Sequence, residues 1–333
     1  HCTMQRAVRL GGIMSRKGWL LFIAISVFWG IPYLFIKIAV RELDPTVVVF
    51  ARVGIAAVVL VPVALLRGMW QQLRQQWRAI IVLSCVQIVG PFLLISYGEQ
   101  HIASSLTSLL IAADPLLVAL FALRFDLSER VRGLRLVGLF IGMGGVVALL
   151  GLDVGGDRQG LLGAGLVLLA AAGYAASALL VKRPTFATLP RLGLVAAACA
   201  VATVVLLPLA VIRLPNRLPD LEVMVSLLVL GLICTALAYL TFFTLVSEVG
   251  ASRGTVFTYV NPVVSVLLGV TLLGEPLNAA MVAGFILIIA GSWISTGGAL
   301  PLPPGHLLRR GLQREAGREA GETGQDAFHQ RMR

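Results

Sequence analysis

Two stretches of the chain place a short polar residue directly before a proline inside an apolar run, as Asp114-Pro115 and as Asn261-Pro262. An ionisable residue in such a run is costly to bury and usually serves a function. Asp114 could therefore hold a proton or the cationic part of a ligand, whereas its counterpart Asn261 has no titratable group. A structural role is the alternative, in which Asp114 caps backbone groups freed by the proline or pairs permanently with a cation.

Both prolines remove a hydrogen bond from the helix that contains them. Pro115 and Pro262 are therefore expected to act as hinges or kinks, and the carbonyl oxygens that they free could face a central cavity. Each run then ends at a glutamate, Glu129 or Glu275, just before the next apolar segment. A carboxylate there can cap exposed N–H groups at the positive end of a helix dipole. The alternative is gating, with each glutamate closing one face of a membrane.

Two cations also lie within apolar segments. Arg52 is the deeper one and could pair with Asp114 or bind a carboxylate of a ligand. Lys37 lies near the end of its segment, so its long side chain is expected to extend the ammonium group to water, and binding of a ligand is the alternative. Glu99 and His101 flank the end of another segment, and both are expected to face water.

Polar and aromatic residues inside the apolar segments are candidates for the wall of a cavity. Buried Tyr and Trp side chains need hydrogen-bond partners, which a wet cavity supplies. Ordinary bonding between helices is the alternative for each of them. The candidates are Trp29, Tyr33, Gln87, Tyr174, Ser177, Tyr239, Thr258 and Tyr259.

The composition indicates which class of protein must position these residues. The chain has 333 residues, of which 58% are hydrophobic and 13% charged, with a mean hydropathy of +0.92. A soluble domain is nearer to about half apolar and about a quarter charged. The sequence therefore predicts an all-α polytopic membrane protein in contact with a lipid bilayer. The net charge of +11 does not indicate nucleic-acid binding, because the basic residues cluster beside apolar segments.

Ten segments are long and apolar enough to cross a bilayer, for which a helix needs about 20 residues. Their connections are short, which predicts one compact bundle, and a β-barrel would show shorter alternating segments. Most Lys and Arg residues fall in the termini and in the loops on the same side of the membrane as the N-terminus. By the positive-inside rule, this predicts that both termini are cytoplasmic. The opposite loops hold Arg41, Arg158, Arg213 and Arg217. The segments are 18–40, 46–66, 78–98, 103–124, 132–151, 160–181, 191–212, 222–245, 252–273 and 277–296.

The two halves of the chain match each other at a nearly constant separation of about 146 residues, which is typical of an internal repeat. Pro62 matches Pro208, and Gly138 matches Gly284. Five segments in each half put the second half in the opposite orientation, so we predict two inverted five-helix repeats. The predicted parts are a cytoplasmic segment 1–17, the repeats 18–151 and 160–296, and a disordered cytoplasmic tail 301–333. Met14 is a candidate start residue.

Small residues predict where helices approach closely. Gly138, Gly142 and Gly145 have the spacing that lets two helices pack together, and we expect packing rather than ligand binding.

The stretch NPVVSVLLGVTLLGEPLNAAMVAGFILIIAG, residues 261–291, resembles the closing signature of the EamA-like family in the drug/metabolite transporter superfamily. A proline early in one segment, Leu-Gly-Glu in the loop and a glycine-bearing last segment carry the resemblance. The first half has a weaker copy, with Leu127-Ser128-Glu129. The resemblance spans roughly residues 19 to 296. It implies export of amino acids, other metabolites or toxic compounds across a bacterial inner membrane, driven by ion gradients or by facilitated diffusion.

The leading hypothesis is a secondary transporter of small molecules that works by alternating access, with protons as candidate coupling ions through Asp114. No Gly-x-x-x-x-Gly-Lys-Ser/Thr loop is present, so ATP is not expected as the direct energy source. One alternative is a lipid-intermediate flippase on the same fold. Another is an intramembrane enzyme, which would need Ser with His, paired Asp or His-Glu-x-x-His at membrane depth. We predict no catalytic residues, no metal site and no cofactor, and the oligomeric state stays open.

Overall fold

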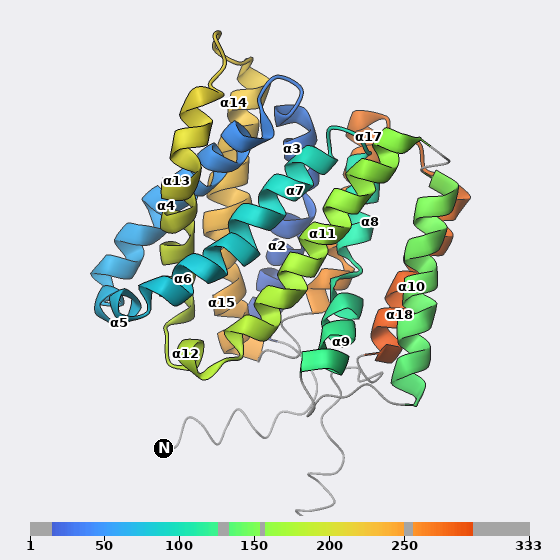
Figure 1. The fold of residues 1–333 in the computed structure, drawn as a ribbon, viewed down its shortest axis with the longest axis horizontal. Coiled ribbons are helices and arrows are strands. Elements are labelled where there is room, and N and C mark those ends of the chain that lie inside the picture. Colours follow the sequence, from blue (N-terminus) through green and yellow to red (C-terminus); the bar gives the residue numbers. More distant parts are fainter. Residues whose placement is uncertain (1–14, 126–132, 154–156, 250–255, 296–333) are drawn as a thin grey trace, which may run out of the picture. The chain divides into compact units, whose positions relative to one another are not determined.

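The computed structural model describes residues 15–125, 133–153, 157–249 and 256–295, all within one compact unit, Ser15–Gly298. Regular structure in these ranges is helical throughout (Figure 1). Eight helical spans are long and apolar enough to cross a membrane by length and composition, and two shorter apolar helices, Phe257–Leu272 and Ala279–Ser295, complete ten. The chain is thus an all-α polytopic membrane protein, as predicted from its composition.

Several spans are interrupted, and we number the spans one to ten in chain order. Spans one, three, four, eight and nine each contain a break or a π-helical segment (η1, η3), whereas α4, α10, α11, α13 and α18 are continuous. In the first half, span one contains α2 (Arg16–Gly30) and α3 (Pro32–Ala39), span two is α4 (Pro45–Leu66), the short α5 (Trp70–Gln75) follows, span three contains α6 (Trp77–Ser84), η1 (Cys85–Val89) and α7 (Gly90–Gly98), span four contains α8 (Ser104–Ile111) and α9 (Asp114–Phe125), and span five is α10 (Leu134–Asp153).

In the second half, span six is α11 (Arg158–Val181), the short α12 (Pro184–Ala187) follows, and span seven is α13 (Arg191–Ile212). Span eight contains α14 (Leu221–Leu228), η3 (Val229–Leu237) and α15 (Ala238–Val249), span nine contains the 3₁₀ turn η4 (Val256–Tyr259) and α17 (Asn261–Leu273), and span ten is α18 (Ala279–Ser295).

Local sequence explains where several helices begin. Ser15 caps α2 by accepting a hydrogen bond from the N–H of Gly18, and Asp44 caps α4 directly before Pro45. Asp157 caps α11 in the same way. Short oxygen-bearing side chains satisfy the first N–H groups of a helix, and proline in the first turn loses no hydrogen bond there.

The helix contacts have the symmetry of an inverted repeat. α4 packs against α13, α10 against α18 and α8 against α17, so equivalent spans of the two halves meet each other. α7 packs against α11, and the equivalent pair, α15 and α2, also packs together. An axis in the membrane plane that relates two inverted halves produces this pattern. The π segments η1 and η3 lie in the equivalent spans three and eight, as the same relation requires.

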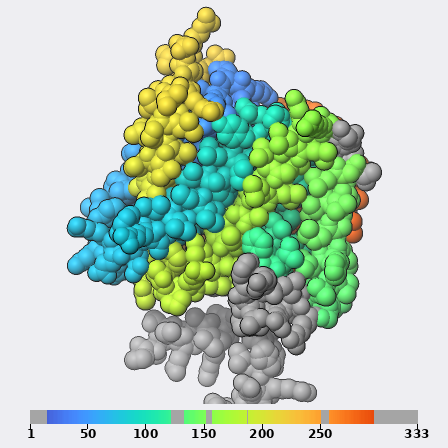
Figure 2. Space-filling model, in the orientation of Figure 1, coloured from blue at the N-terminus to red at the C-terminus, as the bar shows by residue number. Residues whose placement is uncertain are grey.

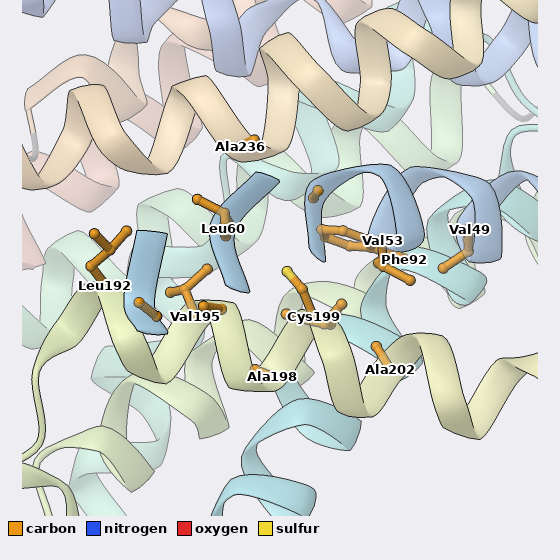
Figure 3. Close-up of a cluster of buried hydrophobic side chains, with 14 of the residues drawn as sticks. Val49, Val53, Leu60, Phe92, Leu192, Val195, Ala198, Cys199, Ala202 and Ala236 are labelled. Atoms are coloured by element: carbon orange, nitrogen blue, oxygen red, sulfur yellow. The ribbon is translucent and has the colours of Figure 1, made fainter. Parts of the chain in front are cut away.

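The apolar core between the halves includes the contact of α4 with α13. Figure 3 shows Val49, Val53 and Leu60 of α4 beside Cys199 and Ala202 of α13. Side chains close the spaces between the ribbons on the visible face of the bundle (Figure 2). Large apolar side chains also remain exposed on the outer surfaces of α10, α13 and other helices, as expected for surfaces that face lipid.

The predicted glycine packing is confirmed at the α10–α18 contact. A Cβ atom on Gly145 would lie 2.8 Å from the carbonyl oxygen of Gly284, and one on Gly138 would lie 2.6 Å from the backbone nitrogen of Ser295. A Cβ on Gly291 would meet the backbone of Gly142. Only glycine allows the two backbones to approach this closely.

Candidate functional site

A cavity of about 290 Å³ lies where the interrupted spans meet. Its wall comes from α2, α3, α4, η1, α7, α8, α9, α11, η3, α15, η4 and α17, so both halves contribute. Apolar and aromatic residues such as Phe92, Phe242 and Phe257 line much of the cavity. The residues predicted from sequence that line it are Trp29, Tyr33, Arg52, Gln87, Asp114, Tyr174, Tyr239, Thr258 and Asn261.

A smaller pocket of about 90 Å³ shares part of this wall, including Tyr33 and Asp114. Tyr259 and both hinge prolines, Pro115 and Pro262, line it. The prolines therefore lie at the helix breaks beside the cavity, as their predicted role requires. Binding of a ligand by any of these residues remains a prediction.

Arg52 is buried and held by two contacts on one side of its guanidinium group. Its Nε donates a hydrogen bond to Thr235 Oγ1 at 2.9 Å, and its Cζ lies 3.9 Å from the ring centroid of Phe92. Thr235 in turn donates to the carbonyl oxygen of Leu230 within η3. Both Nη groups lack a hydrogen-bond partner among the described residues. The contact with the Phe92 ring and the hydrogen bond from Nε fix the position of the guanidinium group. Its two Nη groups stay available for a carboxylate.

Asp114 is the first residue of α9, directly after the break in span four. Its Oδ1 is buried and has no hydrogen-bond partner among the described residues. The structure places no ion pair between Asp114 and Arg52 in the parts of the chain that it describes, so the pairing weighed from the sequence is wrong. A cap on neighbouring backbone through Oδ1 is absent too, so this oxygen of a cavity-lining residue is buried without a partner among the described residues.

The matching residue in the second half makes structural contacts instead. With its amide nitrogen turned toward two carbonyl oxygens, Asn261 donates to Phe257 at 3.0 Å and to Ser26 at 3.1 Å. These bonds join the start of α17 to η4 and to α2. The inverted repeat thus places a fixed amide at one hinge and an unpartnered carboxyl group at the other.

An aromatic cluster forms another part of the wall. The ring of Trp29 lies 5.4 Å from Tyr239, 5.2 Å from Phe242 and 5.1 Å from Phe257, measured between centroids. Tilted and edge-to-face contacts of this kind are favourable between aromatic rings. The cluster joins α2, α15 and η4, and it presents an apolar surface to any ligand in the cavity.

Two predicted site residues lie outside both pockets. Ser177 is buried and donates to the carbonyl oxygen of Tyr174 within α11, because a serine hydroxyl in a helix readily bonds to its own backbone. Lys37 is partly exposed, but its ammonium group is also bonded to the protein, which was not expected. Its Nζ donates to the backbone carbonyl oxygens of Glu99 and of Ile102, the latter at 2.7 Å, which places the cation at the C-terminal end of α7.

Glu275 acts as a helix cap, but on a distant helix rather than on α18, which follows it. Its Oε1 accepts from the N–H of Ser104 at 2.7 Å, and its Oε2 accepts from the N–H of Ser105 at 2.9 Å and from the Ser105 hydroxyl. Burial would raise the pKa of Glu275, but these bonds outweigh it and lower the pKa below its usual value. Asn278 caps α18 instead. Glu129 lies outside the described residues.

The Leu-Gly-Glu turn explains how Glu275 reaches α8. Gly274 adopts the left-handed conformation (φ +67°), which turns the chain back so that the N–H of Glu275 donates to the carbonyl oxygen of Gly269. A Cβ on Gly269 would collide with both Ser105 Oγ and Glu275 Oε2. Two glycines therefore make room for the bond between span nine and span four.

Glu99 does not face water as predicted from the sequence. It is fully buried, and both of its carboxyl oxygens lack a hydrogen-bond partner among the described residues. Its neighbours Gln100 and His101 are exposed, so the polar run gave no signal that one member points inward. Among the described residues, no group of three or more His, Cys, Asp or Glu side chains could hold a metal ion.

A sequence model of the EamA-like transporter family matches this chain over residues 16–151 and again over residues 161–297. A transporter of Archaeoglobus fulgidus is 28% identical over 84% of this chain and 98% of its own. The inner membrane transporter YedA of Escherichia coli K12 is 30% identical over 77% of this chain and 82% of its own. A Salmonella typhimurium protein named "Probable amino-acid metabolite efflux pump" is 26% identical over 86% of this chain and 96% of its own.

A solved crystal structure has the same fold. It aligns with a TM-score of 0.62 over 85% of this chain and 98% of its own, at 22% sequence identity. That likeness supports the ten-span architecture.

Proposed function

We propose that this chain, which belongs to the EamA-like transporter family and is therefore a membrane transporter, exports small metabolites that carry a carboxylate, with amino acids as the first class to test. One observation carries the proposal. Arg52 and Asp114 line the same cavity, and among the described residues no hydrogen bond reaches Asp114 Oδ1 or the Nη groups of Arg52. A cation and a carboxyl group in an aromatic surround match the carboxylate, the ammonium group and the apolar side chain of an amino acid.

The size of the cavity favours a small substrate. Pockets for small molecules measure about 300–1,000 Å³, and this cavity is at the lower limit of that range. A lipid intermediate would need a much larger apolar volume than this cavity provides, so the cavity favours a small solute over a lipid. The name of the Salmonella relative, which refers to amino-acid metabolites and to efflux, agrees with the proposed substrate class and direction.

Alternating access is the proposed mechanism, and polar contacts at the two ends of the bundle support it. At one end, Lys17 of the first half pairs with Glu248 of the second at 3.1 Å. At the other end, Asp44 of the first half pairs with Arg213 of the second at 2.7 Å. Movement of one half against the other would separate one ion pair while the other ion pair is kept. The interruptions of spans four and nine at Pro115 and Pro262 would act as hinges for this movement.

The proposed location is a bacterial inner membrane with both termini in the cytoplasm. The positive-inside pattern of the sequence supports this orientation, and YedA is named as an inner membrane protein. The Lys17 end of the bundle would then face the cytoplasm. Asp44, Glu99 and Glu275 would lie at the opposite end, which we call the Glu275 end.

The test is uptake of a radiolabelled panel of amino acids and related metabolites by proteoliposomes, with and without a pH gradient. The proposal expects saturable uptake of at least one member and its loss in Arg52→Met. Uptake that depends on the gradient and loses this dependence in Asp114→Asn would support proton coupling through Asp114. Asp220→Asn, a change at an exposed helix cap outside the cavity, is the matched control. A folded sample that transports no member of the panel would refute the substrate class.

A further inference from the structure

The carboxyl group of Glu99 is a buried titratable group that neither pocket includes. Glu99 follows α7 directly and has no exposed surface. Neither Oε1 nor Oε2 has a hydrogen-bond partner among the described residues. An ionised carboxylate is strongly disfavoured in such surroundings, because it loses its hydration and gains no donor.

The charged and titratable groups around Glu99 come from three other elements. Lys37 of α3 bonds to the backbone of Glu99, so its ammonium group lies close by without donating to the carboxyl oxygens. Glu275, in the loop between α17 and α18, and Arg52 of α4 also interact electrostatically with Glu99. Tyr33 of α3 is a further titratable neighbour.

The hydrogen-bond donors available to each carboxyl group indicate which of the two is neutral. Glu275 accepts hydrogen bonds from Ser104 and Ser105 at the N-terminal end of α8, all of which favour its ionised form. Lys37 and Arg52 both favour an ionised Glu99, but neither carboxyl oxygen of Glu99 receives a hydrogen bond from a described residue and the side chain is fully buried. The neutral acid is therefore the favoured form of Glu99 in this conformation.

We propose that Glu99 binds a proton when the Glu275 end of the bundle closes and releases it when that end opens. This inference rests on the alternating access proposed above, and it adds a proton site separate from Asp114. The reaction is a simple acid dissociation: the carboxyl group of Glu99 gives one proton to the water that enters, and it regains one from the same solution before closure.

Protonation of Glu99 is coupled to opening because its neighbouring charged groups belong to different halves of the chain. Glu99 and Lys37 lie in the first half of the chain, whereas Glu275 is in the second half and is bound across the interface to α8. Separation of the halves at this end would withdraw Glu275 and admit water to Glu99. Acidification of the solution at the Glu275 end would therefore favour the closed state, and alkaline pH would favour opening.

The experiment measures opening without a substrate. Ser104 is fully buried beside this cluster, so the rate at which a maleimide modifies Ser104→Cys in the detergent-solubilised full chain reports opening. Cys2 and the exposed Cys85 are replaced by serine in this background. The exposed neighbour His101→Cys, measured in parallel, corrects for the ionisation of the thiol itself.

The corrected labelling rate should rise about tenfold per pH unit below the midpoint of the transition, because each opening event releases one proton. Glu99→Gln, which carries a permanently neutral amide, should label slowly and independently of pH. Glu99→Asp should restore the pH dependence. An unchanged slope in Glu99→Gln would overturn the proposal.

Infrared difference spectroscopy on the same protein gives a second measurement. A protonated carboxyl group has a C=O band that shifts in deuterium oxide, and the proposal expects such a band in the parent and in Asp114→Asn. Its persistence in Glu99→Gln combined with Asp114→Asn would also overturn the proposal. Neither measurement needs transport, so a failure of the amino-acid panel would contradict the proposed function while these results still test Glu99.

Discussion

Arg213 Nη1 lies 2.7 Å from Asp44 Oδ2, and this ion pair joins the end of α13 to the start of α4 across the two halves of the chain. The phenol oxygen of Tyr97 lies 3.0 Å from the same Nη1 and 3.4 Å from Asp44 Oδ1. Thr46 adds a contact of 3.2 Å to this phenol oxygen. Side chains of spans two, three and seven and of the loop after span one thus meet in one polar network at the Glu275 end.

The first prediction concerns the pH dependence of this network. Burial raises the pKa of Asp44, but hydrogen bonds from Thr46 and Arg213 outweigh it and lower the pKa below its usual value. The stabilisation is therefore fully present above the unfolded-state pKa of about 3.9 and is lost as pH falls through the folded-state value. Asp44→Asn should lower the melting temperature at neutral pH, and the difference from the parent should shrink in strong acid.

Thermal unfolding of both proteins in detergent across this pH range measures the effect. Glu222→Gln is the control, because Glu222 is an exposed acid in the first turn of α14. A difference between Asp44→Asn and the parent that stays constant from neutral to strongly acidic pH would contradict the assignment to the ionised form of Asp44.

The second prediction separates the two roles of Arg52. Arg52→Lys keeps the positive charge but loses both the planar stack on Phe92 and the fork of two Nη groups. A charge-assisted hydrogen bond contributes about 1.5–3 kcal/mol, so KM for a transported amino acid should rise at least about tenfold. Thr235→Val, which removes the acceptor for Arg52 Nε, should raise KM less, because both Nη groups of Arg52 can still bind the substrate. Equal KM values in the parent and Arg52→Lys would remove the guanidinium from substrate binding.

The sequence predicted much of the fold and of the cavity wall for a physical reason. Each of the ten segments has to be apolar over the thickness of a bilayer, so the polar residues at mid-depth, such as Asp114 and Tyr239, stand out. Depth along one span can be read from a sequence. Which neighbouring span a side chain faces cannot, and this is why Ser177 was placed in the wall although it bonds to its own helix.

The errors at the Glu275 end have the same cause. Glu275 was expected to act on the N–H groups next to it, whereas its partners are Ser104 and Ser105, far away in the sequence. Glu99 is expected in water because it precedes exposed residues, but its side chain is fully buried, and Lys37 from a distant segment bonds to its backbone. The sequence around Glu99 or Glu275 does not show which distant residues lie next to it.

The third prediction tests the Leu-Gly-Glu turn. Alanine at Gly274 would have to adopt a left-handed conformation, at a cost of about 1–2 kcal/mol. Gly269→Ala would drive Glu275 away from Ser105 and remove the cap from α8. Both variants should therefore unfold at lower temperature than the parent. Gly68→Ala, also left-handed but in the loop after α4, is a matched control for backbone strain without loss of the cap.

In the double variant Gly269→Ala with Glu275→Gln, the further loss caused by the second change should be smaller than the loss that Glu275→Gln causes alone. The reason is that Gly269→Ala has already broken the contact. Additive losses of stability would show that the two residues act independently, in conflict with the geometry of the turn.

The fourth prediction concerns the contact between α10 and α18. Gly291 has no room for a side chain, because a Cβ there would meet the backbone of Gly142, and overpacking of this kind costs about 1–3 kcal/mol or more. Gly291→Ala should therefore lower the melting temperature. Gly144→Ala is the matched control in α10, since no atom lies within 4 Å of its Cβ position. It should be neutral or slightly stabilising, because alanine favours a helix over glycine by about 1 kcal/mol. If both variants melt at the parent's temperature, the two helices do not pack through their glycines.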